Sequence, residues 1–180
     1  GVGCTTAIGN TVNWIVIATN TWVGTTSSAW DVASNWSIGV PTVDQNILIS
    51  TNTPNATNLN VDYTLPSGKT LTMSGTGALT IAPQSVLTIA GSANFGNRPV
   101  TVKSDATGDG MIGQVSGSLT NATNVTVERY IPSGKRAFRF LTPGVTTTDY
   151  ISNNWQLATH ITGSTTGANG FDATTTGGPS

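Results

Sequence analysis

The sequence SGKTLTMSGTGALTIAPQSVLTIAG, residues 67–91, decides the fold of this 180-residue chain. A Leu-Thr-Met or Leu-Thr-Ile unit begins at Leu71, Leu79 and Leu87, with a spacing of eight residues. The aliphatic residues of each unit alternate with threonines, so they face one side of a strand while the threonines face the other. Small residues and prolines typical of turns separate the units. The stretch therefore predicts three very short strands joined by turns.

Two all-β architectures have short strands at such regular spacing. One is an antiparallel meander or sandwich. The other is a β-solenoid, in which each strand forms one wall of a coil and stacks on the next coil. Tight hairpins usually contain Asn-Gly or Asp-Gly, and neither dipeptide joins these units. Because an eight-residue step fits one side of a triangular coil, the sequence favours a short β-solenoid.

The flanking segments divide the chain into three predicted regions. Residues 1–45 contain an apolar strand at 12–19 and a tryptophan-rich segment, and we expect them to cap the solenoid at its N-terminal end. Residues 46–124 are predicted to form the solenoid repeats, which fade into a turn-rich insertion at 104–117. Residues 125–180 are predicted to begin a second, incomplete β module with a β-hairpin around IPSGK and a loop-rich remainder.

Composition limits the classes of partner. Only 8% of the residues are charged and the net charge is -1, whereas about 25% is usual for a soluble domain. Nucleic acids and anionic membranes both attract basic patches, so neither is an expected partner. The longest apolar run is well short of the ~20 residues of a membrane span. Threonine is abundant and helix formers are scarce, which predicts an all-β chain with essentially no helix.

Three of the five tryptophans lie in TWVGTTSSAWDVASNW, residues 21–36. Trp22, Trp30 and Trp36 are spaced too widely to share one strand, and turn residues lie beside each of them. If their rings were exposed, they would form a flat platform for binding glycans. If they were buried, they would close the apolar end of the solenoid as a structural cap. Their position directly before the first coil favours the cap.

No set of residues predicts catalysis, and the chain is not expected to be an enzyme. His160 is the only histidine, and no serine lies in a Gly-x-Ser-x-Gly nucleophile elbow. Asp105 and Asp109, in DATGDG, are the best candidates for a metal, because carboxylates on a glycine-rich loop suit Ca²⁺. The alternative is an ordinary Asp/Gly turn. No cofactor is expected apart from this calcium ion.

Four further charged residues lie close together in the sequence: Glu128, Arg129, Arg136 and Arg139. Polysaccharide lyases built on β-helices use basic residues with Ca²⁺, so these four residues would suit such a site in principle. The alternation of charged and apolar residues favours a cross-strand charge ladder on the solvent face of the predicted hairpin.

The threonines of the repeat raise one more possibility. Thr72, Thr80 and Thr88 face away from the apolar side, and some β-solenoids bind ice with a flat threonine array. Such an array needs one set of threonines in each coil, stacked in register. The eight-residue spacing places successive threonines on different walls of a three-walled coil. The sequence therefore predicts a broken ladder and no ice binding.

Several stretches together resemble one group of proteins. They are TWVGTTSSAWDVASNWSIGVPT (21–42), SGKTLTMSGTGALTIAPQSVLTIAGS (67–92), NVTVERYIPSGKRAFRFLTPGVTTTDYISNNWQ (124–156) and THITGSTTGANGFDATTTGGPS (159–180). The combination resembles large secreted and cell-surface, adhesin-like proteins of gliding Bacteroidetes of the flavobacterial type. The resemblance implies export through the type IX secretion system and continuation of the chain past Ser180 toward a sorting domain. It implies no catalytic residues.

These observations predict a non-catalytic extracellular or cell-surface protein with a structural or adhesin role. A β-solenoid stalk would present binding modules of the same long polypeptide, with extracellular polysaccharide as a candidate ligand. One alternative is a carbohydrate-binding or polysaccharide-lyase-related module. A second alternative is a subunit of a surface filament or sheath, which would self-associate by strand addition through residues 12–19.

Overall fold

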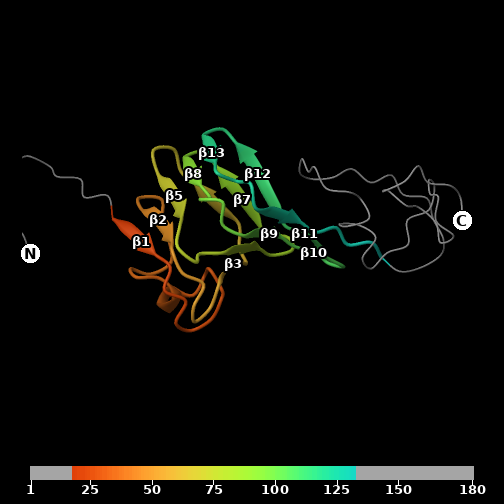
Figure 1. Ribbon diagram of the computed structural model, residues 1–180, viewed down its shortest axis with the longest axis horizontal. Helices are drawn as coiled ribbons and strands as arrows, with labels where there is room; N and C mark the ends of the chain where they lie inside the picture. Colours follow the sequence, from red (N-terminus) through yellow and green to blue (C-terminus); the bar gives the residue numbers. More distant parts are fainter. Residues whose placement is uncertain (1–17, 133–180) are drawn as a thin grey trace, which may run out of the picture. The chain divides into compact units, whose positions relative to one another are not determined.

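The computed structural model describes residues 18–132, which form a three-walled β-solenoid (Figure 1). The first wall contains β1 (Thr19–Thr21), β2 (Asn46–Ile49), β5 (Thr70–Met73), β8 (Ser92–Asn94) and β13 (Ser118–Thr120). The second wall contains β3 (Thr57–Leu59), β6 (Leu79–Ile81), β9 (Val100–Val102) and β14 (Val125–Val127). The third wall contains β4 (Tyr63–Leu65), β7 (Val86–Ile89) and β12 (Met111–Val115).

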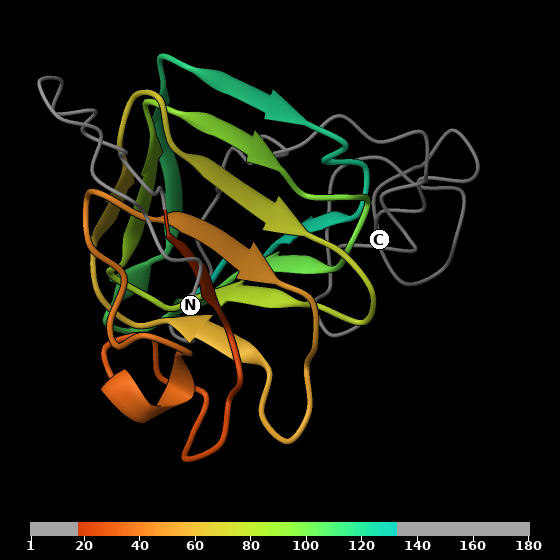
Figure 2. The same cartoon turned by 90° about the vertical axis from the view of Figure 1, so that its left-hand side faces the viewer.

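Every strand pair within these walls is parallel, which confirms the solenoid and excludes the antiparallel meander. In Figure 2 the strands β2, β5, β8 and β13 lie one beside the next and run in the same direction. The one antiparallel pair of strands in the described residues is a small hairpin of β10 (Ser104–Asp105) and β11 (Gly108–Asp109).

Each eight-residue repeat forms one wall of a coil, and three successive repeats follow the chain around the three walls. Leu71 lies in the first wall, Leu79 in the second and Leu87 in the third. Each leucine is buried, whereas the threonine after it is only partly buried and faces outward. The predicted separation of apolar and threonine faces is therefore confirmed.

The core is a continuous stack of aliphatic side chains inside the three walls. Parallel pairing places Leu71 beside Ala93, 22 residues later in the sequence, and Ala93 beside Leu119. Most inward positions of the middle coils are 0–2% exposed, so little apolar surface is left to water. This buried set extends into the predicted cap, and its members are Trp22, Trp30, Trp36, Ile47, Ile49, Leu59, Leu65, Leu71, Met73, Leu79, Ile81, Leu87, Ile89, Ala93, Phe95, Val100 and Val102.

One corner of the coil is built by glycine. Gly91 lies between β7 and β8, and Gly117 occupies the same corner one coil later, where its amide donates to the Ile89 carbonyl at 3.1 Å. A Cβ on Gly91 would collide with the backbone carbonyl oxygens of Pro66 and Lys69 in the preceding coil. Glycine is therefore required here because the backbones of successive coils lie in direct contact.

We expect Gly91→Ala to lower the free energy of unfolding by about 1–3 kcal/mol, the usual cost of overpacking a site whose surroundings are rigid. Urea denaturation followed by far-UV circular dichroism measures this loss. Ser67→Ala is the matched control, because Ser67 is exposed at the same corner one coil earlier. Equal stabilities of the two variants would contradict the close contact between coils.

Three boundaries differ from the sequence-based expectation. The sequence predicts a second module from residue 125, but β14 pairs in parallel with β9 and belongs to the second wall. The turn-rich insertion at 104–117 instead contains the β10–β11 hairpin and β12, which continues the third wall. Strand β1 lies in the predicted cap region but belongs to the first wall. Parallel pairing with a strand one coil away places β1, β12 and β14 in the walls.

The expectation of essentially no helix is confirmed for residues 18–132, where the one helical element is a single 3₁₀ turn, η1 (Ala33–Asn35). The predicted hairpin around IPSGK lies outside the described residues except for its first strand. That strand is β14, which belongs to the solenoid.

Thr57 is an inward-facing polar residue in the second wall. Its side chain is fully buried, and its hydroxyl has no hydrogen-bond partner among the described residues. A buried polar group without a partner loses its hydration and gains nothing in return. We therefore expect Thr57→Val, which replaces the hydroxyl with a methyl group, to raise the free energy of unfolding by about 1 kcal/mol. Thr64→Val, at an exposed position of the third wall, should leave the urea midpoint within error, and a loss of stability in Thr57→Val would refute the expectation.

Candidate functional site

The three tryptophans of the N-terminal segment form one buried cluster. Trp22, Trp30 and Trp36 are 1%, 1% and 4% exposed. Trp36 makes edge-to-face contacts with both other rings, at centroid distances of 5.0 Å to Trp22 and 4.6 Å to Trp30. Edge-to-face packing aligns the positive edge of one ring with the negative face of another. The rings therefore close the N-terminal end of the core as the sequence predicts.

The indole N–H groups are also used inside the cap. Trp22 Nε1 donates to the Asn55 carbonyl at 2.8 Å, which joins the cap to the first full coil. Trp36 Nε1 donates to the Trp30 carbonyl at 2.7 Å. A flat glycan platform needs exposed ring faces and free polar edges. These three residues offer neither, so their geometry does not fit the glycan-platform alternative.

The cap also covers the free strand edges at this end of the solenoid. Ser37 donates its amide to the Thr21 carbonyl at 2.9 Å and accepts a bond from the Thr21 amide on its hydroxyl. On the second wall, the backbone amide of Asn58 donates to the Ser28 carbonyl, and the backbone amide of Trp30 donates to the Asn58 carbonyl. Unpaired edges of a sheet attract strands of other chains. The segment therefore protects two of the three walls from edge-to-edge association at this end.

Asn35 holds the cap segment together. Its side chain is completely buried. Its Oδ1 accepts hydrogen bonds from the amides of Thr26 and Ser27, both at 3.0 Å, and its Nδ2 donates to the Ser27 hydroxyl and the Ala29 carbonyl. All four hydrogen-bonding positions of the side-chain amide are thus satisfied within one loop. The sequence alone does not distinguish Asn35 from a surface turn residue, because it is an asparagine between two turns.

A second buried asparagine fixes the loop that follows the cap. Asn20 lies in β1, is 0% exposed, and donates to the Gly39 carbonyl at 2.6 Å and to Gln45 Oε1 at 3.0 Å. Its position in β1 faces the inside of the first wall, next to Ile47 of β2. Asn20 thereby satisfies polar groups of the loop at the point where the apolar core ends.

Tyr63 packs against this cap from the third wall. Its ring centroid lies 5.0 Å from that of Trp30, and its hydroxyl has no hydrogen-bond partner among residues 18–132. Burial raises the pKa of Tyr63 to about 12, because removal from water disfavours the phenolate.

The raised pKa of Tyr63 predicts a pH-dependent stability. The folded protein holds the phenolic proton more tightly than the unfolded chain, whose tyrosine pKa is about 10. The stabilising contribution is therefore complete below about pH 10 and is lost as the pH rises through about 12. The free energy of unfolding, measured at several pH values between about pH 9 and pH 12, should show this decline. The Tyr63→Phe variant should not show it. A decline of the same size in Tyr63→Phe would rule out Tyr63 as its source.

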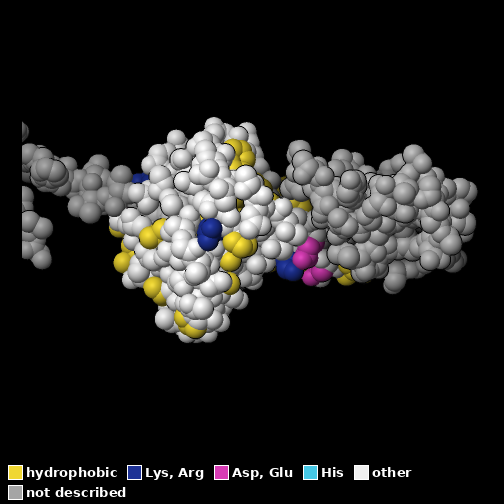
Figure 3. Space-filling model, in the orientation of Figure 1, with side chains coloured by type: hydrophobic (Ala, Val, Ile, Leu, Met, Phe, Trp, Pro, Cys, Tyr) yellow, Lys and Arg dark blue, Asp and Glu magenta, His cyan; other side chains and the backbone are white. Residues whose placement is uncertain are grey.

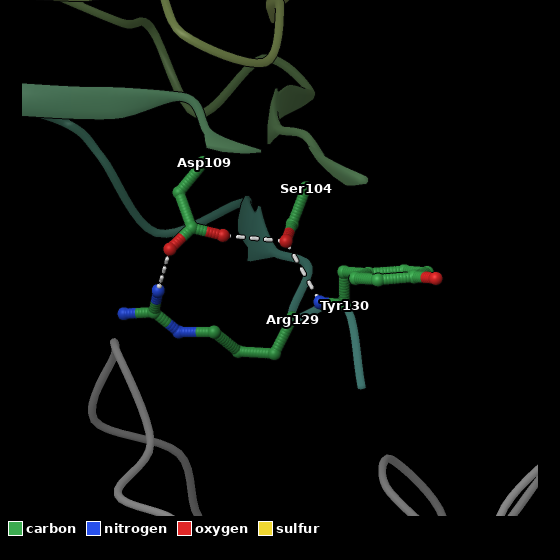
Figure 4. A network of polar contacts seen from close by, with 4 residues as sticks. All are labelled: Ser104, Asp109, Arg129 and Tyr130. Atoms are coloured by element: carbon green, nitrogen blue, oxygen red, sulfur yellow. Dashed lines mark hydrogen bonds and ion pairs between the residues drawn. The ribbon is translucent and has the colours of Figure 1, made fainter. Parts of the chain in front are cut away.

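The two predicted calcium ligands belong to the β10–β11 hairpin and face different partners, and Figure 4 shows those of Asp109. Asp105 Oδ1 accepts hydrogen bonds from both the amide and the hydroxyl of Thr107. These bonds, the hydroxyl bond first, lower the pKa of the exposed Asp105 carboxyl. Asp109 accepts from the Ser104 hydroxyl and forms an ion pair with Arg129 at 2.6 Å. Each carboxylate therefore has a partner in the protein.

Within residues 18–132 no group of three His, Cys, Asp or Glu side chains is arranged to hold a metal ion. Calcium binding at Asp105 and Asp109 stays a prediction, and it would require backbone carbonyls or water as additional ligands. His160 lies outside the described residues.

Glu128 and Arg129 connect the last described coil to the one before it. Glu128 forms an ion pair with Lys103 at 2.6 Å, and Arg129 forms the pair with Asp109. These are cross-strand pairs between coils rather than rungs of the predicted hairpin ladder. Both pairs are substantially exposed, so each contributes about 0–1 kcal/mol. Arg136 and Arg139 lie outside the described residues.

No helix among the described residues is long and apolar enough to span a membrane. Neither a protein-family model, nor a curated protein, nor a solved structure matches the chain.

Proposed function

We propose that this chain is a non-catalytic structural or adhesin protein of the bacterial cell surface, in which the β-solenoid is a stalk that holds binding modules of the same polypeptide. The observation that carries the proposal is the closed N-terminal end of the solenoid. At the N-terminal end, buried tryptophans and backbone hydrogen bonds close the core. A closed end fits the start of a rod, because no further coil can stack there.

The other end of the described coils has the opposite character. Strands β12, β13 and β14 are the last members of their walls in the described residues. Their inward residues Ile112, Leu119, Val125 and Val127 are only partly buried, although they pack against the core. A solenoid end of this kind accepts another coil or a cap. The closed first coil and the partly buried core residues of the last described coil together support the stalk proposal.

The surface chemistry supports an extracellular location. The described part of the face drawn in Figure 3 is formed mainly by uncharged polar side chains and backbone, with few charged groups. A surface of this kind gives no long-range attraction to nucleic acids or to anionic lipids. Together with the resemblance to flavobacterial surface proteins, it supports export through the type IX system. In such a stalk, many weak contacts made by the attached modules would sum to firm adhesion.

The test uses the complete gene product in the bacterium that encodes it. We expect brief protease treatment of intact cells to remove an epitope tag placed in the exposed loop around Val43, and deletion of the gene to reduce attachment to polysaccharide-coated surfaces. Inactivation of the secretion system should retain the tag inside the cell. A tag that stays protected in intact wild-type cells would refute the surface location.

The rival functions predict other results in the same strains. A carbohydrate-binding module would bind on a glycan array as the isolated chain. A filament formed by strand addition through residues 12–19 would yield polymers of the isolated chain. Of that segment the structure describes Ala18 and Thr19. The Asn46 amide donates to the Ala18 carbonyl, and Thr19 pairs with Asn46 of the same chain; residues 12–17 lie outside the described residues. If the isolated chain binds glycans or forms polymers, and attachment is unchanged in the deletion strain, the stalk proposal is refuted in favour of that rival function.

A further inference from the structure

Both ion pairs in the described part of the chain lie at one place, directly after β14. Residues 128–130, which we call the strap, contact the base of the β10–β11 hairpin. Glu128 pairs with Lys103, and Arg129 pairs with Asp109, each at 2.6 Å. Only 8% of the residues of this chain are charged, so two ion pairs from adjacent residues are not a general property of its surface.

The strap is held by side chains, whereas the walls are held by backbone ladders. The parallel pairing of β14 with β9 ends at Val127 and Val102. The Glu128 amide still donates to the Val102 carbonyl at 2.9 Å. Further along the strap, the Tyr130 amide donates to the Ser104 hydroxyl at 2.7 Å. The position of the strap therefore depends on charged groups and one hydroxyl rather than on the sheet.

Two of the strap contacts depend on one carboxylate (Figure 4). Asp109 Oδ2 pairs with Arg129, and Asp109 Oδ1 accepts a hydrogen bond from the Ser104 hydroxyl. Because that hydroxyl donates its proton to Asp109, the lone pairs of its oxygen are available to the Tyr130 amide. Loss of the Asp109 charge therefore weakens the contacts of both Arg129 and Tyr130.

The hairpin that receives the strap is fixed independently of it. Gln84 Nε2 donates to the Thr107 carbonyl at 2.7 Å, and the Gln84 amide donates to the Asp109 carbonyl at 3.1 Å. Asp105 accepts hydrogen bonds from the amide and the hydroxyl of Thr107 at the turn. None of these bonds includes a strap residue, so the hairpin keeps its shape when the strap moves.

We propose that the strap is a latch that opens as the ionic strength rises, while the solenoid stays folded. Each exposed ion pair is weak. The three contacts come from consecutive residues, so an open contact is kept near its partner by the other two. The four charged side chains of the ion pairs are 37–54% exposed, so dissolved ions reach them directly. The screening length falls from about 30 Å at 0.01 M to about 3 Å at 1 M ionic strength.

In the stalk of the proposed function, this latch would be a switchable joint. When it is closed, it fixes the direction in which the chain leaves β14. When it is open, the chain turns freely at the end of that strand. The joint role rests on the stalk proposal, whereas the latch itself does not. The test below uses the purified 180-residue chain, so its outcome is separate from that of the surface-location experiment.

Hydrogen exchange of the Tyr130 amide, followed by NMR, measures the opening of the latch. We expect the protection of this amide to fall several-fold between about 0.01 M and about 1 M sodium chloride. The Lys103 amide donates to the Ile81 carbonyl within the second wall, and its protection should not change. This difference separates the opening of the strap from unfolding of the coil.

Asp109→Asn should remove the protection of the Tyr130 amide already at low salt. Asp105→Asn is the matched control, because it makes the same change on the same hairpin at a carboxylate that bonds to Thr107 rather than to the strap. Brief trypsin digestion, with the fragments identified by mass spectrometry, gives a second readout. Cleavage after Arg129 should be several-fold faster in Asp109→Asn than in Asp105→Asn.

Three results would overturn the latch. The first is a Tyr130 amide that is equally protected at both salt concentrations. The second is equal behaviour of Asp109→Asn and Asp105→Asn in exchange and in digestion. The third is a loss of protection of the Lys103 amide together with that of Tyr130, because the whole coil would then be opening.

Discussion

Trp30→Ala is expected to lower the free energy of unfolding by about 3–5 kcal/mol, the usual range for removing a buried tryptophan. Trp30 is 1% exposed and lies between the rings of Trp36 and Tyr63, at centroid distances of 4.6 and 5.0 Å. Removal of the indole leaves a cavity between the rings of Trp36 and Tyr63. Both rings are anchored in the backbone of other segments, so they cannot move in to fill it. Trp36 Nε1 keeps its bond to the carbonyl of residue 30, so the loss is one of packing.

Urea denaturation, followed by tryptophan fluorescence and far-UV circular dichroism, measures the effect of Trp30→Ala. Val43→Ala is the control in the same N-terminal region, because Val43 is 66% exposed and surface changes usually stay within about 0.5 kcal/mol. We also expect the Trp30→Ala variant to self-associate more readily, because loss of cap packing exposes the strand edges that the cap covers. A stability loss below about 1 kcal/mol would show that the indole does not complete the core.

The second large effect is expected for Asn35→Ala, a loss of about 3 kcal/mol in the free energy of unfolding. The substitution leaves two backbone amides and the Ala29 carbonyl without the partner that the buried Asn35 side chain supplies in this partly buried loop. Unpaired buried groups cost more than the net value of the bonds that they lose, because they do not regain their bonds to water. The cost therefore falls on the backbone of the cap rather than on the removed side chain.

Two further variants test this explanation of the Asn35 effect. Asn35→Asp retains an acceptor for the amides of Thr26 and Ser27 but buries a carboxylate oxygen against the Ala29 carbonyl, so it should be less stable than the native protein. Asn52→Ala is the control, because Asn52 is exposed on the loop that precedes β3. If Asn35→Ala unfolds at the same urea concentration as Asn52→Ala, then Asn35 does not organise the cap.

The repeat pattern specifies each wall strand of the solenoid without reference to the rest of the fold. In the segment 67–91 the aliphatic residues alternate with threonines, and this alternation specifies which side of each strand is buried. The eight-residue step specifies that successive strands lie on successive walls, as Leu71, Leu79 and Leu87 do. The burial of Trp22 was predictable from the apolar end that the first coil would otherwise expose. All of these are local consequences of side-chain chemistry and chain direction.

The pairing of residues a whole coil apart depends on the folded chain. The parallel register joins Leu48 to Thr72 and Thr72 to Asn94, and it assigns β14 to the solenoid rather than to a second module. The pairing of Asp109 with Arg129 likewise depends on the path of the chain between them. The length of each corner varies from coil to coil, so sequence spacing does not specify the register. It is set by hydrogen bonding and core packing between adjacent coils, which are interactions of residues more than twenty positions apart.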